Sequence, residues 1–241
     1  MSGYDVDLAY IHDAGFSSYC LGAAPGVLRM LRSASFTEGL VVDLGCGSGR
    51  WARELDRVGY RVWGVDQPRA FVRMARGLAP HAKFVNASLW DVALPACDAV
   101  TSLGECLNYA FDAAAGRRRL ARLFARVYQA LRQGGIFVFD VATPARIPED
   151  GPQKLWMKGR GWAILVETDG DARRNTLTRR IIAFRKVRGG YRRSEEVHKL
   201  HLYRPDEVLH ELRRAGFEAR ELSSYGRFRL PQGIRGFRAC K

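Results

Sequence analysis

Residues 39–49 read Gly-Leu-Val-Val-Asp-Leu-Gly-Cys-Gly-Ser-Gly, and they are the most informative stretch of the chain. The apolar run at 40–44 is long enough for one buried strand, and residues 50–58 follow with an apolar face typical of a helix. Where a strand passes through a glycine turn into a helix, free backbone N–H groups point outward and bind ligands. The stretch therefore predicts a ligand site, and a tight turn without a ligand is the alternative.

The glycines recur at every second position, whereas a dinucleotide-binding turn has the spacing G-x-G-x-x-G. Asp43 precedes the first glycine by two residues, and its carboxylate would repel a pyrophosphate but suits a ligand with an ammonium group. Both features disfavour an NAD-dependent oxidoreductase. The segment VVDLGCGSG (41–49) resembles motif I of the class I S-adenosylmethionine-dependent methyltransferases. The resemblance implies that the turn wraps the methionine part of the cofactor, with Asp43, Gly45, Cys46, Gly47 and Gly49 as contacts.

Two later segments agree with this resemblance. A short β-rich run at 61–65 ends in Asp66, 21 residues after Gly45, near the offset at which a strand-end acid binds both ribose hydroxyls. The expected strand at 83–86 leads to the segment that contacts adenine in the family, although Trp90 there is equally explained by core packing. The remaining cofactor contacts that the resemblance implies are Gln67, Ser88, Leu89, Trp90 and Leu103.

The segment SLGECLNY (102–109) lies where the family places the reacting methyl group. It lacks the N/D-P-P-Y/F tetrapeptide of methyltransferases that act on DNA bases, and it resembles small-molecule methyltransferases instead. We expect Tyr10, His12, Asn108 and Tyr109 to bind substrate and Glu105 to take part in catalysis. A structural role for Asn108 and Tyr109, through capping and packing, is the alternative.

The order of the predicted elements indicates an α/β protein with a doubly wound, seven-stranded, mostly parallel sheet. An amphipathic helix over 120–131 leads to a strand at 136–141, and a helix at 206–215 precedes two paired strands at 217–222 and 233–239. The resemblance to the methyltransferase fold covers about residues 39–141 and 204–240.

Two further segments flank this domain. Residues 1–38 are expected to form a helical extension with a helix at 17–32, and the resemblance to small-molecule methyltransferases implies that it closes over cofactor and substrate. The equal alternative is that the aromatic segment before this helix is its packing edge, with His12 and Asp13 as turn and cap residues. After a Pro/Gly-rich crossing at 144–161, alternating apolar residues predict a three-stranded antiparallel insertion within about 155–203 of the main domain, 39–241, with turns at Asp169–Gly170 and Gly189–Gly190. We expect this insertion to cover the active site, and it is a candidate surface for a homodimer.

The positive charge of the chain raises the question of a nucleic-acid partner. The net charge is +14, and residues 154–204 hold 14 basic and 5 acidic residues. Most such stretches are the solvated side of a sheet, but a nucleic-acid partner is not excluded. No apolar run approaches the roughly 18 residues that span a bilayer, and the five cysteines include no CxxC pair. We therefore expect a cytoplasmic protein without a membrane partner or a metal site.

Together these features predict transfer of a methyl group from S-adenosylmethionine to a nitrogen, oxygen or carbon of a small-molecule acceptor. His198 is the expected proton acceptor, because a histidine with an unperturbed pKa of about 6.5 is largely neutral at pH 7. A histidine with a purely structural place in the sheet is the alternative. An RNA methyltransferase or basic nucleic-acid-binding protein, and a pseudoenzyme that binds the cofactor, remain alternative functions.

Overall fold

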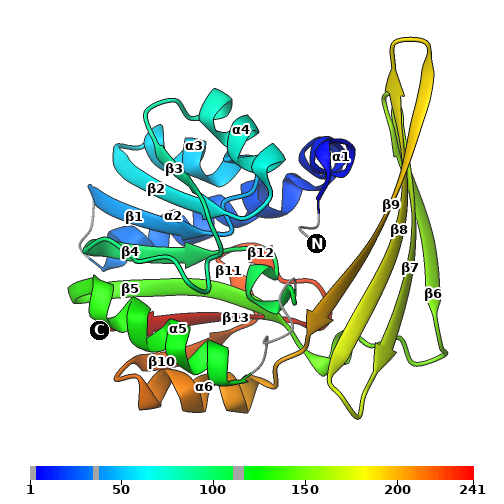
Figure 1. The fold of residues 1–241 in the computed structure, drawn as a ribbon. Coiled ribbons are helices and arrows are strands. Elements are labelled where there is room, and N and C mark those ends of the chain that lie inside the picture. The colour runs from blue at the N-terminus through cyan, green and yellow to red at the C-terminus, as the bar shows by residue number, and fades with distance from the viewer. Residues whose placement is uncertain (1–3, 35–37, 111–116) are drawn as a thin grey trace.

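The computed structural model describes residues 4–34, 38–110 and 117–241 (Figure 1). Its central sheet has seven strands in the order β10-β13-β5-β4-β1-β2-β3, and β13 runs antiparallel to both neighbours while the other pairs are parallel. The predicted fold class, including the closing pair of strands, is confirmed. The strands are β1 Gly39–Leu44, β2 Tyr60–Asp66, β3 Lys83–Asn86, β4 Cys97–Ser102, β5 Leu131–Ala142, β10 Glu218–Leu222 and β13 Ile234–Cys240.

Helices cover both faces of this sheet, which explains why its central strands are apolar almost throughout. Neighbouring residues of one strand enter opposite cores: Val41 packs with α2, α3 and α4, whereas Val42 packs with α5 and α6. Figure 1 shows these two helical layers with the sheet between them. The helices are α1 Val6–Phe16, α2 Ser18–Ser33, α3 Arg50–Asp56, α4 Arg69–Leu78, α5 Arg117–Ala130 and α6 Pro205–Arg214, with single 3-10 turns η1 Cys106–Asn108 and η2 Pro144–Arg146.

The insertion between β5 and α6 has four antiparallel strands, so the prediction of three was wrong. The strand that the sequence failed to predict, β6, lies in the Pro/Gly-rich crossing, and all seven of its residues are exposed. The predicted turn at Asp169–Gly170 was also wrong, since both residues pair with β8 and the chain turns at 172–175 instead. The strands are β6 Gln153–Gly159, β7 Trp162–Asp171, β8 Thr176–Val187 and β9 Gly190–His201.

The N-terminal segment forms two helices rather than one. Helix α2 matches the predicted helix within one residue at each end, and α1 covers the aromatic segment before it. Helix α1 contacts both α4 and β8, so it lies between the parallel sheet and the insertion (Figure 1). The expected boundary at residue 38 follows residues 35–37, which lie outside the described residues. A short hairpin, β11 Ser224–Tyr225 and β12 Phe228–Arg229, packs on α2.

Two negative findings apply to the part of the chain that the structure describes. No helix in it is long and apolar enough to cross a membrane. No group of three or more His, Cys, Asp or Glu side chains in it is placed to hold a metal ion.

Candidate active site

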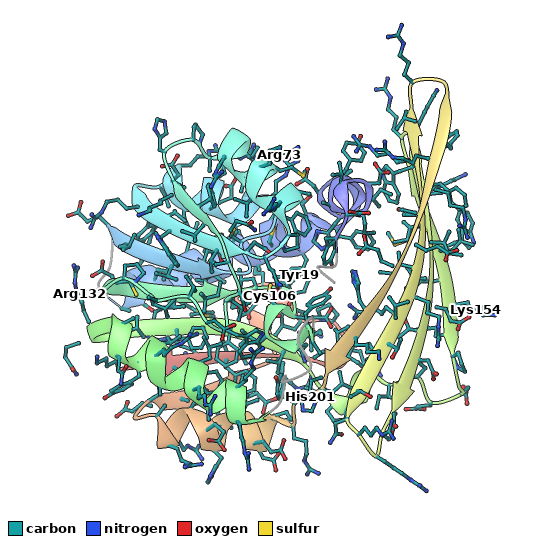
Figure 2. The ribbon with its side chains drawn as sticks, viewed as in Figure 1. Tyr19, Arg73, Cys106, Arg132, Lys154 and His201 are labelled. Atoms are coloured by element: carbon teal, nitrogen blue, oxygen red, sulfur yellow. The ribbon has the colours of Figure 1, made fainter. Side chains whose placement is uncertain are left out.

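A cavity of about 520 Å³ lies where the parallel strands β1, β2 and β4 end. The glycine turn and the segments after β2, β3 and β4 form one side of it, and α1 and the inner face of the insertion form the other. Figure 2 shows Tyr19 and Cys106 at the edge of the sheet that faces the insertion. The carboxyl ends of parallel strands are where open α/β sheets bind ligands, so this cavity is the candidate active site.

The glycine turn borders the cavity with its backbone. Gly47 has a φ of +52°, and a Cβ added to it would meet no atom within 4 Å. The turn is held in place because the N–H groups of Gly45 and Cys46 both donate to the carbonyl of Val65 on β2. A ligand can therefore approach the Gly47 backbone closely. Glycine adopts this backbone conformation without the strain that a residue with a side chain would have.

Gly45 and Gly49 serve the turn in other ways. A Cβ on Gly45 would lie 2.6 Å from the Cβ and Sγ of Cys106, so this glycine makes room for the segment after β4. A Cβ on Gly49 would lie 2.9 Å from the Cα of Ala75 on α4, and Gly49 does not border the cavity. The expected cofactor contact at Gly49 is therefore corrected to a role in packing α3 against α4.

Two carboxylates border the cavity on either side of the turn. Asp43 is buried, and its Oδ1 accepts a hydrogen bond from Thr101 Oγ1 at 3.0 Å. Asp66 accepts hydrogen bonds from the N–H groups of Gly47 and Gln67 at 2.7 and 2.8 Å. Burial raises the pKa of Asp43 to about 7 and the pKa of Asp66 to about 6. A ligand that offers an ammonium group or hydroxyls to these acids would favour their ionised forms.

The other expected cofactor residues also border the cavity. The segment after β3 is fixed by two hydrogen bonds, from Trp90 N–H to Ser88 Oγ and from Arg126 to the carbonyl of Leu89. An open glycine turn, two acids and this partly apolar segment fit the amino-acid, ribose and adenine parts of S-adenosylmethionine. The cavity-lining members of the expected set are Asp43, Gly45, Cys46, Gly47, Asp66, Gln67, Ser88, Leu89, Trp90 and Leu103.

Glu105 borders the cavity opposite the turn and is held in an ion pair. Both of its oxygens accept hydrogen bonds from Arg179 Nη2 on β8, at 3.1 and 3.2 Å. Arg146 Nε lies 4.0 Å from the same carboxylate. The Glu105 carboxylate is thus held between two arginines.

The backbone of Glu105 is held by a buried acid, Asp140 on β5. Asp140 accepts hydrogen bonds from the N–H groups of Gly104 and Glu105, which both have positive φ, and from the hydroxyls of Tyr19 and Tyr225. Burial raises its pKa to about 6. Asp140 therefore links the segment after β4 to α2 and to the β11–β12 hairpin.

His198 on β9 borders the cavity and pairs with a glutamate. Its Nε2 lies 2.8 Å from Glu196 Oε2, and Glu196 also accepts hydrogen bonds from the N–H groups of Tyr4 and Asp5 before α1. Although burial raises the pKa of Glu196, the hydrogen bonds from His198 and from this backbone bring it below its ordinary value. Glu196 therefore fixes the orientation of the His198 ring at the edge of the cavity.

His12 and Tyr109 border the cavity as expected, and both belong to a group of aromatic rings around Tyr4. The ring centroids of Tyr4 and His12 are 5.2 Å apart, and those of Tyr4 and His198 are 4.7 Å apart. Burial lowers the pKa of His12 to about 4, so its imidazole is neutral at physiological pH.

Two expected substrate residues do not reach the cavity. Tyr10 lies on another side of α1, where its ring packs against the guanidinium of Arg185 with 3.9 Å from centroid to Cζ. Asn108 is fully buried, and its amide donates to the carbonyls of Ala142 and His201 and accepts from the N–H of Ala142. Both expectations are corrected. Tyr10 lies on the wrong side of α1, and the amide of Asn108 is already hydrogen-bonded to the backbone of β5 and β9.

Several residues at the cavity were not identified from the sequence. Asp13 on α1 accepts hydrogen bonds from Ser48 and Arg50, and Arg179 and Asp140 hold Glu105 as described above. Their partners are 35 to 74 residues away in the chain. No local spacing or periodicity connects such residues, so single-sequence reasoning had no means of finding them.

Comparison with known proteins supports the expected family. Residues 41–135 match the family model described as a methyltransferase domain. A curated relative from Geobacillus sp. (strain WCH70), named "Putative methyltransferase GWCH70_2453", is 24% identical over 194 residues, which is 76% of each chain.

Solved structures share the fold over nearly the whole chain. An S-adenosylmethionine-dependent methyltransferase from Clostridium acetobutylicum ATCC 824 superimposes with a TM-score of 0.82 at 16% identity, covering 96% of both chains. The sugar N-methyltransferase KedS8 from Streptoalloteichus sp ATCC 53650 gives a TM-score of 0.77 at 21% identity and covers 100% of this chain and 94% of that one. Together, the domain match over residues 41–135, the strand order and the fit of the cavity support a class I S-adenosylmethionine-dependent methyltransferase, with S-adenosylmethionine as its cofactor.

Proposed function

We propose that this methyltransferase methylates an amine nitrogen of a small-molecule acceptor. The observation that carries the proposal is the His198–Glu196 pair, whose histidine borders the same cavity as the glycine turn. The structural likeness to a protein described as a sugar N-methyltransferase adds support, because that description names nitrogen as the methylated atom. A cavity of this size, covered by α1 and the insertion, suits a small molecule.

Bound S-adenosylmethionine supplies a methyl group on a positively charged sulfur, which is a good leaving group. The chain itself has three tasks, of which the first is to hold both reactants in line in a cavity from which water is excluded. Such positioning can lower a barrier by about 7–11 kcal/mol. We assign the cofactor side to Asp43, Gly47 and Asp66, and the acceptor side to Tyr109 and Glu105.

The second task is to free the lone pair of the acceptor, because an aliphatic amine is mostly protonated at neutral pH. We assign this proton to the imidazole of His198, while Glu196, 2.8 Å from Nε2, orients the ring and stabilises the imidazolium that forms. Asp43, Gly47 and Asp66 would hold the cofactor, which would supply its methyl group to the freed lone pair and keep the electrons of the C–S bond on sulfur. A base of this kind typically contributes about 10²–10⁴-fold in rate.

The third task is to orient the acceptor, which we assign to the segment that carries Glu105. The ion pair of Glu105 with Arg179 orients this segment after β4. We therefore assign Glu105 to positioning of the acceptor.

The test uses purified protein, cofactor with a labelled methyl group, and a panel of small amines, alcohols and phenols, with products identified by mass spectrometry. We expect label on nitrogen, and His198→Ala and Glu196→Gln should lower kcat by about 10²-fold while leaving the affinity for the cofactor unchanged. Label on oxygen or carbon, or undiminished kcat in His198→Ala, would contradict the assignment. Methylation of bulk RNA at 150 mM salt would point to the nucleic-acid alternative, and tight cofactor binding without any turnover would point to a pseudoenzyme.

A further inference from the structure

The inner face of the insertion presents two rows of apolar side chains to the cavity. Strand pairing aligns Leu155 of β6 with Val166 of β7 and Ile181 of β8 in one row. It aligns Met157 with Ile164 and Ala183 in the next row. Because neighbouring strands are about 4.8 Å apart, each row extends for about 10 Å. Five of these six side chains border the cavity, namely Leu155, Met157, Ile164, Val166 and Ile181.

Leu8 and Ile11 of α1 pack on the inner part of the rows, at Ile164, Ile181 and Ala183, so it is the outer part that is left open to solvent. Leu155 is 41% exposed and Met157 is 36% exposed, although both face the cavity. Trp156 lies between them on β6, is 67% exposed and does not border the cavity, as the alternation of a strand requires. The exposed apolar side chains therefore lie on both faces of β6, and those on the inner face continue into the active site.

The apolar rows lead directly to the polar side chains of the proposed reaction. Ile181, Arg179 and Leu177 alternate along one face of β8, and Arg179 pairs with His198 on β9. On this face of β8, the aliphatic side chain of Ile181 is thus followed two residues away by the charged side chain of Arg179. A molecule that lies along the rows would place one end beside His198 and Glu105.

We propose that the acceptor is an amphipathic amine, with an apolar body that lies along these two rows and an amino group that reaches His198. This inference rests on the proposed function. A polyhydroxylated acceptor would bury its hydroxyls against aliphatic side chains that offer no hydrogen bond, which is costly. An apolar body instead removes Leu155 and Met157 from water, together with its own surface.

The experiment compares straight-chain primary amines, from ethylamine to decylamine, as methyl acceptors at saturating cofactor. We expect kcat/KM to rise about fourfold for each added methylene until the rows are covered, which corresponds to burial of about 0.8 kcal/mol per CH₂. Binding of the same amines is measured by calorimetry with S-adenosylhomocysteine present, so that the result does not depend on turnover. Affinity should follow the same dependence on length.

Matched variants on one strand locate the effect. Leu155→Ser and Met157→Ser should reduce the gain for each methylene, whereas Trp156→Ser, on the other face of β6, should retain it. The affinity for S-adenosylmethionine should be unchanged in all three. Circular dichroism and the unchanged cofactor affinity show that the variants are folded.

Three results would overturn the inference. One is an affinity for the amines that does not depend on their chain length. Another is a gain for each methylene that Trp156→Ser reduces as much as Leu155→Ser and Met157→Ser do. The third is a change in the oligomeric state of Leu155→Ser and Met157→Ser, measured by sedimentation velocity, without a change in their affinity for the amines. A second copy of the chain would then be what covers this face. If no amine is methylated but long amines still bind with an affinity that rises with chain length, the proposed function fails, while the rows are retained as the binding surface for an apolar body.

Discussion

Asp13 and Arg50 form a bidentate ion pair, with Nε and Nη2 of the guanidinium at 2.8 and 2.7 Å from the two carboxylate oxygens. Ser48 Oγ donates to the same carboxylate. The pair links α1 to the first residue of α3, immediately after the glycine turn. The pair therefore fastens the part of α1 that covers the cavity to the cofactor-binding turn.

Asp13→Asn should weaken binding of S-adenosylmethionine by about tenfold, in the range expected for loss of a charged hydrogen bond. The amide retains one acceptor oxygen but loses the charge that matches Arg50, so α1 covers the cofactor less firmly. Titration calorimetry measures the effect. Asp7→Asn is the matched control, because Asp7 links the same helix to Arg185 and Arg192 of the insertion. We expect Asp7→Asn to change the acceptor KM more than the cofactor affinity, and equal effects of the two variants would contradict this division.

Gly47→Ala should weaken cofactor binding more than it weakens the fold. The new methyl group would enter open space that borders the cavity, and the positive φ adds about 1 kcal/mol of backbone strain. Gly59→Ala controls for the strain, since Gly59 has a φ of +95°, also has no neighbouring atom within 4 Å of an added Cβ, and does not border the cavity. Calorimetry and thermal unfolding of both variants separate binding from stability. A Gly47→Ala variant that binds the cofactor as tightly as Gly59→Ala does would show that the turn does not approach it.

Gly45→Ala should behave differently, because its Cβ would overlap Cys106 rather than the cavity. A sequence reading alone treats Gly45 and Gly47 alike, as glycines that make room for the cofactor. The structure predicts that the Gly45 variant loses stability and displaces the segment that carries Glu105. A lower melting temperature than that of Gly47→Ala is the expected measurement.

The affinity for S-adenosylmethionine should rise with pH between 5 and 8. Burial raises the pKa of Asp43 to about 7 and that of Asp66 to about 6, so both acids are partly protonated in this range. The ammonium group and ribose hydroxyls of the cofactor favour the ionised acids, so binding releases protons and strengthens as pH increases, by at most about tenfold per pH unit for each acid. Calorimetry at several pH values tests this. Asp66→Asn should lower the affinity at pH 8 and reduce the pH dependence below pH 6, and an unchanged profile would exclude Asp66 as a cofactor ligand.

The cofactor half of the site was predictable because its residues follow single strands. Gly47 and Asp66 each come directly after an apolar run, and strand ends of a parallel sheet converge at one edge. The acceptor half depends on pairs such as Glu105–Arg179, which join segments 74 residues apart. The strand β6 escaped prediction for a related reason: all its residues are exposed, so burial imposes no alternating pattern on its sequence.

Tyr225→Phe should destabilise the protein more at pH 8 than at pH 5. The native pKa of Asp140, about 6, is above the ordinary value of 3.8, so the native state holds this proton more tightly than the unfolded chain does. By itself, Asp140 therefore makes the free energy of unfolding decrease as pH rises from about 4 to about 6. Removing the Tyr225 hydroxyl takes a donor from the ionised carboxylate and raises this pKa further, which deepens the decrease.

At pH 8 we expect Tyr225→Phe to lower the free energy of unfolding by about 1–3 kcal/mol, the usual cost of a lost buried hydrogen bond to a charged group. At pH 5 the native Asp140 is largely protonated, so the hydroxyl contributes less and the loss should be smaller. Urea unfolding at both pH values measures the difference. Tyr191→Phe is the control, because Tyr191 is 62% exposed and its hydroxyl should contribute little at either pH. An equal loss at pH 5 and pH 8 in Tyr225→Phe would mean that the hydroxyl does not act through the charge of Asp140.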